Sequence, residues 1–321
     1  MKYYEDSGAV FYRGDCCEIL RGLPESCVQT CVTSPPYWGL RDYQCAGQIG
    51  LEDTPEAYVA RMVEVFREVR RVLRDDGTLW LNLGDSYSGS GPSGASYQSA
   101  TTKRRQDGGS VDGAFRISKT LAARGLTYAE KKPIPPPGLK HKDLVGIPWR
   151  VAFALQADGW WLRQDIIWHK PNPMPESVRD RCTKAHEYVF LLSKSPKYYF
   201  DSEAMKEPAA YAGQMRGGST NRYEQNSAGM DHKIYDTRNK RSVWSVPVRP
   251  YKGAHFATFP PALIEPCVKA GCPEGGTVLD PFLGSGTTAQ VARKFGRTCV
   301  GCELNEEYLK LAVSRFNKVE K

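Results

Sequence analysis

The stretch Thr33-Ser34-Pro35-Pro36-Tyr37-Trp38 combines hydrogen-bond acceptors with a flat aromatic face. Proline has no amide hydrogen, and a residue before proline is held in extended geometry, so we expect the carbonyl groups of Ser34 and Pro35 to be unpaired and fixed in direction. These carbonyls and the Ser34 hydroxyl can accept hydrogen bonds from an amino group, and Tyr37 offers a ring for stacking. The stretch therefore predicts a site for an amine-bearing planar ring, although Ser-Pro-Pro-Tyr alone is also typical of a surface turn.

A second stretch, near the other end of the chain, has the pattern of a nucleoside-binding turn. Residues 276–280 are predicted to form a strand, the glycine-containing turn 281–286 leads into a helix, and residues 297–302 form the next strand, which closes with Glu303. Glu303 follows Gly284 by 19 residues, close to the spacing at which a carboxylate meets ribose hydroxyls in βαβ units. The segment lacks the lysine of a phosphate-binding loop, which favours a nucleoside over a dinucleotide or a triphosphate.

The elements around these stretches predict an α/β fold. A short apolar strand, 28–32, delivers Ser34, and a strand over 8–15 ends in Asp15. Thr54 and Pro55 are typical of a helix start, and apolar residues then recur every three or four positions through Leu73. Further elements are predicted at 78–83, 147–155, 160–168, 186–193 and 260–270. Ligands of open α/β sheets bind at the carboxyl ends of strands, where Asp15, Ser34 and Glu303 all lie.

Composition indicates a globular protein. Of the 321 residues, 40% are hydrophobic, and no run approaches the ~18 uncharged apolar residues of a membrane span. The N-terminus has no apolar signal core, so we expect a cytoplasmic location. The 10 cysteines are scattered, which indicates reduced thiols. Cys299 and Cys302 have neither a second CxxC nor paired histidines, and we predict no metal site.

The net charge of +8 is concentrated in two irregular segments. Residues 86–145 contain 10 basic and 4 acidic side chains, and residues 201–258 contain 9 and 6. Basic segments on a neutral framework are typical of proteins that bind nucleic acid, although they also occur as solvated surface. The candidate phosphate or base contacts are Lys103, Arg104, Arg105, Arg238, Lys240 and Arg241.

Taken together, Thr-Ser-Pro-Pro-Tyr followed much later by Asp-Pro-Phe-Leu-Gly-Ser-Gly-Thr-Thr resembles the amino-group DNA methyltransferases of the β arrangement. The resemblance covers residues 8–85, 146–195 and 255–316. It implies a Rossmann-like methyltransferase fold with a mostly parallel seven-stranded sheet and a circularly permuted motif order, in which strand 8–15 lies beside strand 297–302. It also implies S-adenosyl-L-methionine as the methyl donor and double-stranded DNA as the substrate.

The resemblance divides the chain into functional segments. Residues 1–85 and 146–200 would form the catalytic half, and residues 255–321 the cofactor-binding half. Residues 86–145 would be a basic insertion rich in Gly, Ser and Pro, and residues 201–254 a target-recognition region.

The resemblance also implies roles for particular residues. The catalytic motif would be Ser34, Pro35, Pro36 and Tyr37, with Trp168 as another wall around a base that has left the duplex. The cofactor would contact Asp15, Phe256, Phe259, Asp280, Phe282, Gly284, Ser285, Gly286, Thr287 and Glu303. Among these, Glu303 would meet the ribose and Asp15 the adenine.

The identity of the methylated amine is a finer question. In the resembled family Ser at the first motif position usually accompanies cytosine N4, and Asp or Asn accompanies adenine N6, so Ser34 favours cytosine. Methylation at cytosine C5 would need a thiolate, and we assign Cys267 of the Pro266-Cys267 pair to the core. A catalytically silent DNA-binding protein and an RNA methyltransferase remain alternatives. The sequence leaves open the recognition site, a homodimer and a cognate restriction endonuclease.

Overall fold

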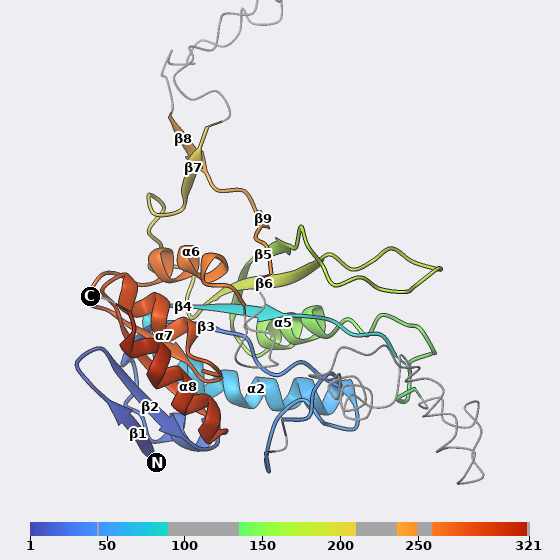
Figure 1. The fold of residues 1–321 in the computed structure, drawn as a ribbon, viewed down its shortest axis with the longest axis horizontal. Coiled ribbons are helices and arrows are strands. Elements are labelled where there is room, and N and C mark those ends of the chain that lie inside the picture. The colour runs from blue at the N-terminus through green and yellow to red at the C-terminus, as the bar shows by residue number, and fades with distance from the viewer. Residues whose placement is uncertain (44, 89–134, 210–235, 249–258, 320–321) are drawn as a thin grey trace, which may run out of the picture.

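The computed structural model describes residues 1–43, 45–88, 135–209, 236–248 and 259–319. Its main sheet has nine strands (Figure 1). These strands are β1 (Lys2–Glu5), β2 (Ala9–Arg13), β3 (Val28–Thr33), β4 (Leu73–Leu83), β5 (Trp161–His169), β6 (His186–Ser193), β9 (Val243–Ser245), β10 (Thr277–Asp280) and β11 (Thr298–Glu303). Their order across the sheet is β1-β2-β11-β10-β3-β4-β6-β5-β9.

The centre of the sheet is parallel. The strands β2, β11, β10, β3 and β4 pair with one another in parallel, whereas β6 is antiparallel to both β4 and β5. Val10 of β2 lies opposite Val300 of β11, so the two ends of the chain pair as expected. Because the central strands are parallel, the residues that follow β2, β3, β10 and β11 meet at one edge of the sheet.

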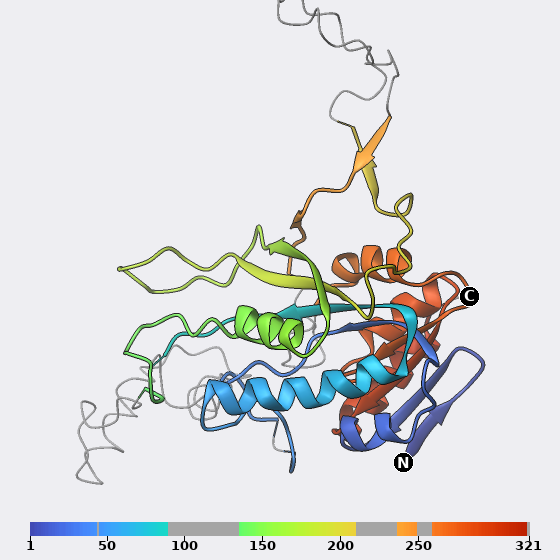
Figure 2. The same cartoon turned by 180° about the vertical axis from the view of Figure 1, so that it is seen from behind.

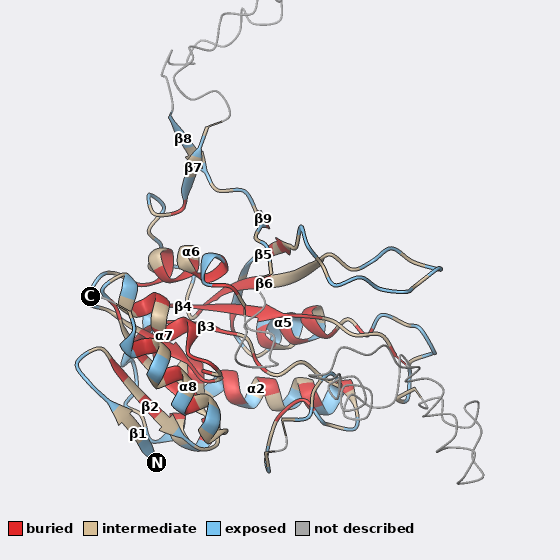
Figure 3. Ribbon diagram, in the orientation of Figure 1, coloured by how far each residue is buried: buried red, intermediate tan, exposed pale blue. Residues whose placement is uncertain are grey.

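Helices cover both faces of the sheet (Figures 1 and 2). On one face lie α1 (Cys16–Arg21), α2 (Pro55–Val72) and α5 (Ile147–Ala157), and on the other lie α6 (Pro261–Gly271), α7 (Thr287–Lys294) and α8 (Glu306–Asn317). The N-terminus of α2 is capped by the Thr54 hydroxyl, which accepts a hydrogen bond from the Ala57 amide. The apolar stripe of α2 faces the core, and Figure 3 shows the central strands buried between the two layers.

The expectation of seven strands was too low. One of the two extra strands is β1. The Oδ1 of Asp6 accepts hydrogen bonds from the Gly8 and Ala9 amides, and this turn lets β2 run back antiparallel along β1. The segment predicted to be irregular supplies β9, in which Val243 lies opposite Ile167. The strand β4 also begins earlier than predicted, directly after α2.

Two hairpins extend beyond the compact body. A separate two-stranded sheet, formed by β7 (Lys206–Pro208) and β8 (Thr237–Asn239), projects away from the helices in both views. The connection between β5 and β6, residues 170–185, projects from the antiparallel end of the main sheet (Figure 1). Within the described ranges, none of the helices has the length and apolar character needed to cross a membrane.

Candidate active site

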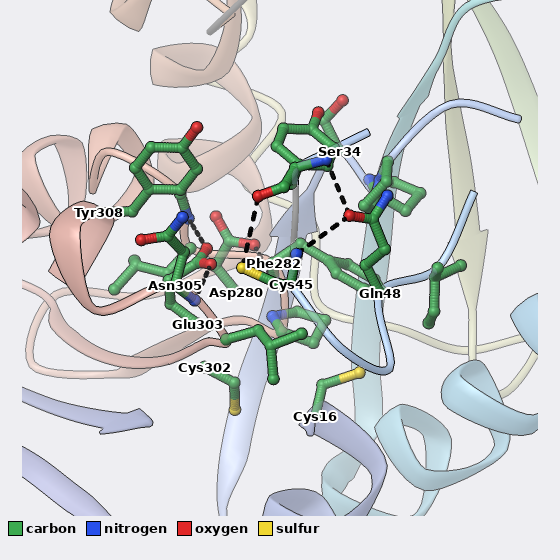
Figure 4. A pocket seen from close by; sticks show the side chains of 18 of the residues that line it. Cys16, Ser34, Cys45, Gln48, Asp280, Phe282, Cys302, Glu303, Asn305 and Tyr308 are labelled. Carbon is green, nitrogen blue, oxygen red and sulfur yellow. Dashed lines mark hydrogen bonds between the residues drawn. The ribbon is translucent and has the colours of Figure 1, made fainter. Parts of the chain in front are cut away.

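A cavity of about 330 Å³ lies at the carboxyl ends of the parallel strands (Figure 4). Residues 34–37, which follow β3, line it together with residues 280–285, which end β10 and lead into α7. The two stretches singled out by the sequence are therefore neighbours in space. A cavity of this size suits a small organic ligand.

Asp280, at the end of β10, is a buried carboxylate that is 2% exposed. Its Oδ1 accepts hydrogen bonds from the Thr33 hydroxyl at 2.6 Å and the Phe282 amide at 3.0 Å. Its Oδ2 accepts one from the Thr288 hydroxyl at 2.6 Å. Burial raises the pKa of Asp280 to about 6, although the three hydrogen bonds lower it. The carboxyl group thus ties β3, β10 and α7 together at the floor of the cavity.

Glu303, at the end of β11, holds the glycine turn. Its Oε2 accepts a hydrogen bond from the Gly284 amide and its Oε1 one from the Asn305 amide, both at 2.8 Å. Burial raises the pKa of Glu303, and these amides lower it. Gly284 has φ of +52°, and a Cβ there would come no closer than 3.8 Å to a neighbouring atom. A carboxylate oxygen can accept more than one hydrogen bond, so Glu303 can also bind ligand hydroxyls.

Gly286 is not among the residues that line the cavity, and its contact with the cofactor stays a prediction. It has φ of +79°, and a Cβ there would lie 2.8 Å from the Ala312 Cβ, so this glycine lets α8 pack against the start of α7. Ser285 and Thr287 do line the cavity. Arg315 donates to the Ser285 carbonyl at 2.7 Å, to the Ser285 hydroxyl, and to the Thr287 hydroxyl at 3.3 Å.

Asp15 lines the cavity from the end of β2. Its Oδ1 caps α1, and its Oδ2 forms an ion pair with Arg61 at 3.1 Å. The side chains of Phe259 and Phe282 line the same cavity. Phe256, the other aromatic residue predicted here, lies outside the described residues. The contact of Asp15 with adenine stays a prediction.

The proline pair exposes acceptors as the sequence suggested. Among the described residues we find no hydrogen bond to the carbonyl oxygens of Ser34 and Pro35. The Pro36 carbonyl, in contrast, accepts a hydrogen bond from the Tyr58 hydroxyl at 2.9 Å. Tyr58 of α2 therefore fixes the turn through the Pro36 carbonyl. The carbonyl oxygens of Ser34 and Pro35 can still accept hydrogen bonds from a ligand.

Tyr37 is held at its ring and at its hydroxyl. Its ring packs against Gly84, where a Cβ would lie 2.4 Å from the ring Cε2. The hydroxyl donates to Glu187 Oε2 at 2.7 Å and lies 3.1 Å from Asn82 Oδ1, and the Ser34 hydroxyl lies 3.4 Å from it. Burial, followed by the Glu187 charge, raises the pKa of Tyr37 well above its ordinary value, so it is a neutral donor.

Several cavity residues were missed by sequence reasoning. Glu187 lines the cavity, and the Asn82 amide donates a hydrogen bond to it. Asn82 is a polar residue in the otherwise apolar stretch 79–83, and this interruption of the pattern was its only signal. Gln48 orders the loop after the proline pair, because its Oε1 accepts from the Tyr43 amide at 2.8 Å. The Tyr43 ring contacts the Tyr308 ring of α8 edge-on, with centroids 6.4 Å apart, and both rings line the cavity (Figure 4 labels Gln48 and Tyr308).

Trp168, the predicted further wall around the base, is not among the residues that line the cavity, and its contact with a base stays a prediction. It is 4% exposed and packs in the core. Its indole N–H donates to the Val246 carbonyl at 2.8 Å, and the Lys170 ammonium lies 4.4 Å from its ring centroid. Side chains of a strand alternate between the two faces of its sheet, and the Trp168 side chain packs in the core on the face that α6, α7 and α8 cover.

The predicted DNA-contact residues are only partly described. Lys103, Arg104 and Arg105 lie outside the described residues. Arg238 of β8 and Arg241, which follows β8, each form an ion pair with Glu207 of β7 at 2.9 Å. We call the β7–β8 sheet together with residues 240 and 241 the β7–β8 arm. Lys240 lies 5.3 Å from the ring centroid of Trp244. Each guanidinium has five N–H donors, so pairing through Nε leaves others for phosphate.

Most of the described cysteines are buried, and the exception in chemistry is the pair Cys16 and Cys17, which lies beside Asp15 with ligand atoms within 4.8 Å of one another. The hydrogen bond with Cys16 lowers the pKa of Cys17. Cys299 and Cys302 belong to the cores on opposite faces of the sheet, and Cys267 is buried within α6. Three thiols line the cavity, those of Cys16, Cys45 and Cys302. The pKa of Cys16 is raised chiefly by its hydrogen bond with Cys17, and burial raises the pKa of Cys45 and of Cys302. These cavity thiols are therefore poor thiolates at neutral pH.

Comparison with known proteins agrees with this arrangement. A family model for DNA methylase, of the N6/N4 type, matches residues 28–314. The type II methyltransferase M.SmaI of Serratia marcescens is 49% identical over 303 residues, covering 94% of this chain and 89% of that protein. The type II methyltransferase M.Cfr9I of Citrobacter freundii is 47% identical over 312 residues, covering 97% and 89%.

Solved structures share the fold. The PvuII DNA methyltransferase, described as cytosine-N4-specific, superposes with a TM-score of 0.62 at 19% identity, covering 98% of this chain and 89% of that one. A DNA modification methylase of Thermus thermophilus, solved with S-adenosyl-L-methionine, superposes with a TM-score of 0.56 at 23% identity, covering 96% and 93%. On the family match and the two close relatives, the chain belongs to the amino-group DNA methylases.

Proposed function

We propose that this protein methylates N4 of cytosine in double-stranded DNA, with S-adenosyl-L-methionine as the methyl donor. The observation that carries the proposal is the meeting of Ser34 and Glu303 in one cavity, which they line from opposite ends of the chain. Ser34 belongs to a group of acceptors for an amine, and Glu303 to a cradle for a nucleoside. Methylation of adenine N6 by the same residues is the alternative, since a serine can accept a hydrogen bond from either amine.

The cavity residues fit S-adenosyl-L-methionine. Gly284 borders open space, the Glu303 carboxylate has lone pairs available for ribose hydroxyls, and Phe259 and Phe282 offer apolar faces. Asp15, Ser285 and Thr287 would complete the contacts. When bound, the cofactor supplies a methyl group on a positively charged sulfur, which is an electrophile.

The residues of the proline turn prepare the amine. An exocyclic amine is conjugated with its ring and is a weak nucleophile. Hydrogen bonds from the amine to the Ser34 hydroxyl and to the Pro35 carbonyl would fix its orientation and favour its pyramidal form. The Tyr37 ring, which lines the cavity, would stack on the base, and the base must leave the duplex to reach the cavity.

The test is identification of the product. Purified protein is incubated with S-adenosyl-L-methionine and plasmid DNA from a methylation-deficient host, and the DNA is digested to nucleosides for mass spectrometry. We expect N4-methylcytosine. N6-methyladenine would reassign the target base, and 5-methylcytosine or no product would contradict the proposal. Competition between labelled duplex DNA and structured RNA tests the nature of the nucleic acid, and calorimetric titration with the cofactor tests for a catalytically silent relative.

A further inference from the structure

Three residues form a chain of hydrogen bonds that begins at the catalytic serine. The Ser34 hydroxyl lies 3.4 Å from the Tyr37 oxygen, and the Tyr37 hydroxyl lies 2.7 Å from Glu187 Oε2. All three residues line the cavity. Glu187 comes from β6, on the antiparallel side of the sheet, and neither motif includes it.

Glu187 is surrounded by hydrogen-bond donors. Its Oε1 pairs with the Lys170 ammonium, and the two side chains are 16% and 19% exposed. The Asn82 amide donates to Oε2 at 3.3 Å, and the same amide donates to the Tyr188 carbonyl at 3.0 Å. A partly buried charge with a close counter-ion and amide donors is well compensated. As a carboxylate, Glu187 accepts hydrogen bonds and donates none.

This charge sets the direction of the whole chain. The Tyr37 hydroxyl has one hydrogen, and both acceptors beyond it, Glu187 Oε2 and Asn82 Oδ1, draw that hydrogen away from Ser34. The Tyr37 oxygen is then an acceptor toward Ser34, so the serine hydrogen points to Tyr37. The Ser34 oxygen therefore presents only lone pairs to the cavity, which is what an incoming amine donor requires.

We propose that Glu187 is a positioning residue that, through Tyr37, keeps Ser34 as an acceptor and receives the proton lost by the methylated amine. This inference rests on the proposed function. As the nitrogen–methyl bond forms and the sulfur–methyl bond breaks, the amine proton passes to the Ser34 oxygen. The serine proton passes to Tyr37, and the Tyr37 proton passes to Glu187. The products are a neutral methylated amine, S-adenosylhomocysteine and a carboxylic acid at Glu187.

The hydrogen-bond chain is tested first without cofactor or DNA. Protein labelled with carbon-13 at the tyrosine Cζ position gives one signal per tyrosine, and the signal of Tyr37 is the one lost in Tyr37→Phe. We expect this signal to move in Glu187→Gln, because the phenol loses its anionic acceptor. In Glu176→Gln, which removes the carboxylate paired with Arg181 in the 170–185 hairpin, it should not move. An unchanged Tyr37 signal in Glu187→Gln would overturn the inference.

Single-turnover transfer of labelled methyl to duplex DNA then tests the role. Glu187→Gln and Tyr37→Phe should each slow transfer by about 100-fold, as expected for loss of a proton acceptor, with unchanged affinity for S-adenosyl-L-methionine. Because both residues act in one chain, the double variant should be no slower than either single variant. A further full decrease in the double variant would show that Glu187 acts independently of Tyr37.

Two controls keep these outcomes separate. If Glu187→Gln does not fold, Tyr37→Phe still decides the matter, because the ring keeps its packing on Gly84 and only the hydroxyl is lost. An unchanged transfer rate in Tyr37→Phe would overturn the inference. If the unaltered protein produces no methylated nucleoside, the proposed function fails instead, and the carbon-13 measurement still reports on the hydrogen-bond chain.

Discussion

At the scale of the residue, the buried carboxyl group of Asp280 holds together the elements that form the floor of the cavity. Asp280 gains three hydrogen bonds from Thr33, Phe282 and Thr288, yet burial outweighs them, and its pKa is raised to about 6. Its folded pKa therefore lies above that of the unfolded chain, so folding takes up a proton between these values. The contribution of Asp280 to stability is greatest below the unfolded pKa and is lost as pH rises through about 6.

The first prediction concerns Asp280→Asn. Between about pH 4 and pH 6, the unfolding free energy of the unaltered protein should fall by about 2 kcal/mol from this group alone, because a shift of one pKa unit is worth about 1.4 kcal/mol in full. The variant lacks this term, so the stability difference between the two proteins should shift by that amount in favour of the variant. Urea denaturation of both proteins from pH 4 to pH 7.5 measures it. Parallel curves across this range would contradict the assignment.

The second prediction is a matched pair of glycine substitutions. Gly284→Ala places a Cβ beside the cavity at φ of +52°, and it should weaken binding of S-adenosyl-L-methionine at least about tenfold with about 1 kcal/mol of strain. Gly286→Ala places a Cβ against Ala312, and it should lower stability by about 2–3 kcal/mol through overpacking. Calorimetric titration and thermal melting separate the two effects. If both variants lost the same cofactor affinity and neither lost stability, the different roles assigned to Gly284 and Gly286 would be contradicted.

At this scale the sequence predicted which residues stand at strand ends but not what their side chains touch. Ser34, Asp280 and Glu303 could be placed because an ending strand fixes a position in any parallel sheet. The contacts of Tyr37 with Glu187 could not be predicted, since they join elements far apart in the chain. The packing of Trp168 could not be predicted for the same reason: its strand was right, but the residue that pairs with it, Trp244, belongs to β9.

At the scale of elements, the contact between the end of β4 and residues 34–37 fixes the position of the Tyr37 ring. Gly84 follows β4 directly, and its lack of a side chain leaves room for Tyr37. Local pattern predicted α2, with its Thr54 cap and its apolar spacing, and it predicted β3 and β10. It did not predict β1 and β9, which are short and gain their stability from pairing with an existing edge.

The third prediction tests this junction. In Gly84→Ala the new methyl group would lie 2.4 Å from Tyr37 Cε2, so the ring must move. We expect methyl transfer to fall by more than about 100-fold, as for a misplaced reacting group, and cofactor affinity to stay unchanged. Gly22→Ala, at the end of α1 with ordinary contacts, is the control and should keep its activity. Normal transfer by Gly84→Ala would show that the position of Tyr37 is not critical.

At the scale of the molecule, a neutral framework carries basic segments. The β7–β8 sheet projects from the body (Figure 1). Arg241, which follows β8 and pairs with Glu207 of β7, has a side chain that is 70% exposed. Most residues of the two basic segments lie outside the described residues, so the arm is the part of the predicted recognition region whose charges can be placed. We propose that it contacts the DNA backbone.

The fourth prediction follows from this proposal. Arg241→Ala should weaken duplex binding several-fold whatever the sequence, and it should reduce the slope of log affinity against log salt by about 1. Arg74→Ala removes the same charge at the start of β4. This start is at the opposite end of the parallel strands from the cavity, and the Arg74 side chain is 62% exposed. It should change neither quantity. Fluorescence anisotropy at several salt concentrations measures both, and equal effects of the two substitutions would argue against contact through the arm.

The central claim is that two segments far apart in the sequence build one binding site. Hydrogen–deuterium exchange with and without S-adenosylhomocysteine tests it most directly. We expect exchange to slow in peptides from both residues 34–49 and residues 281–308, and to stay unchanged in the middle of α2. Protection confined to residues 281–308, with residues 34–49 unaffected by a saturating concentration of the ligand, would contradict the claim.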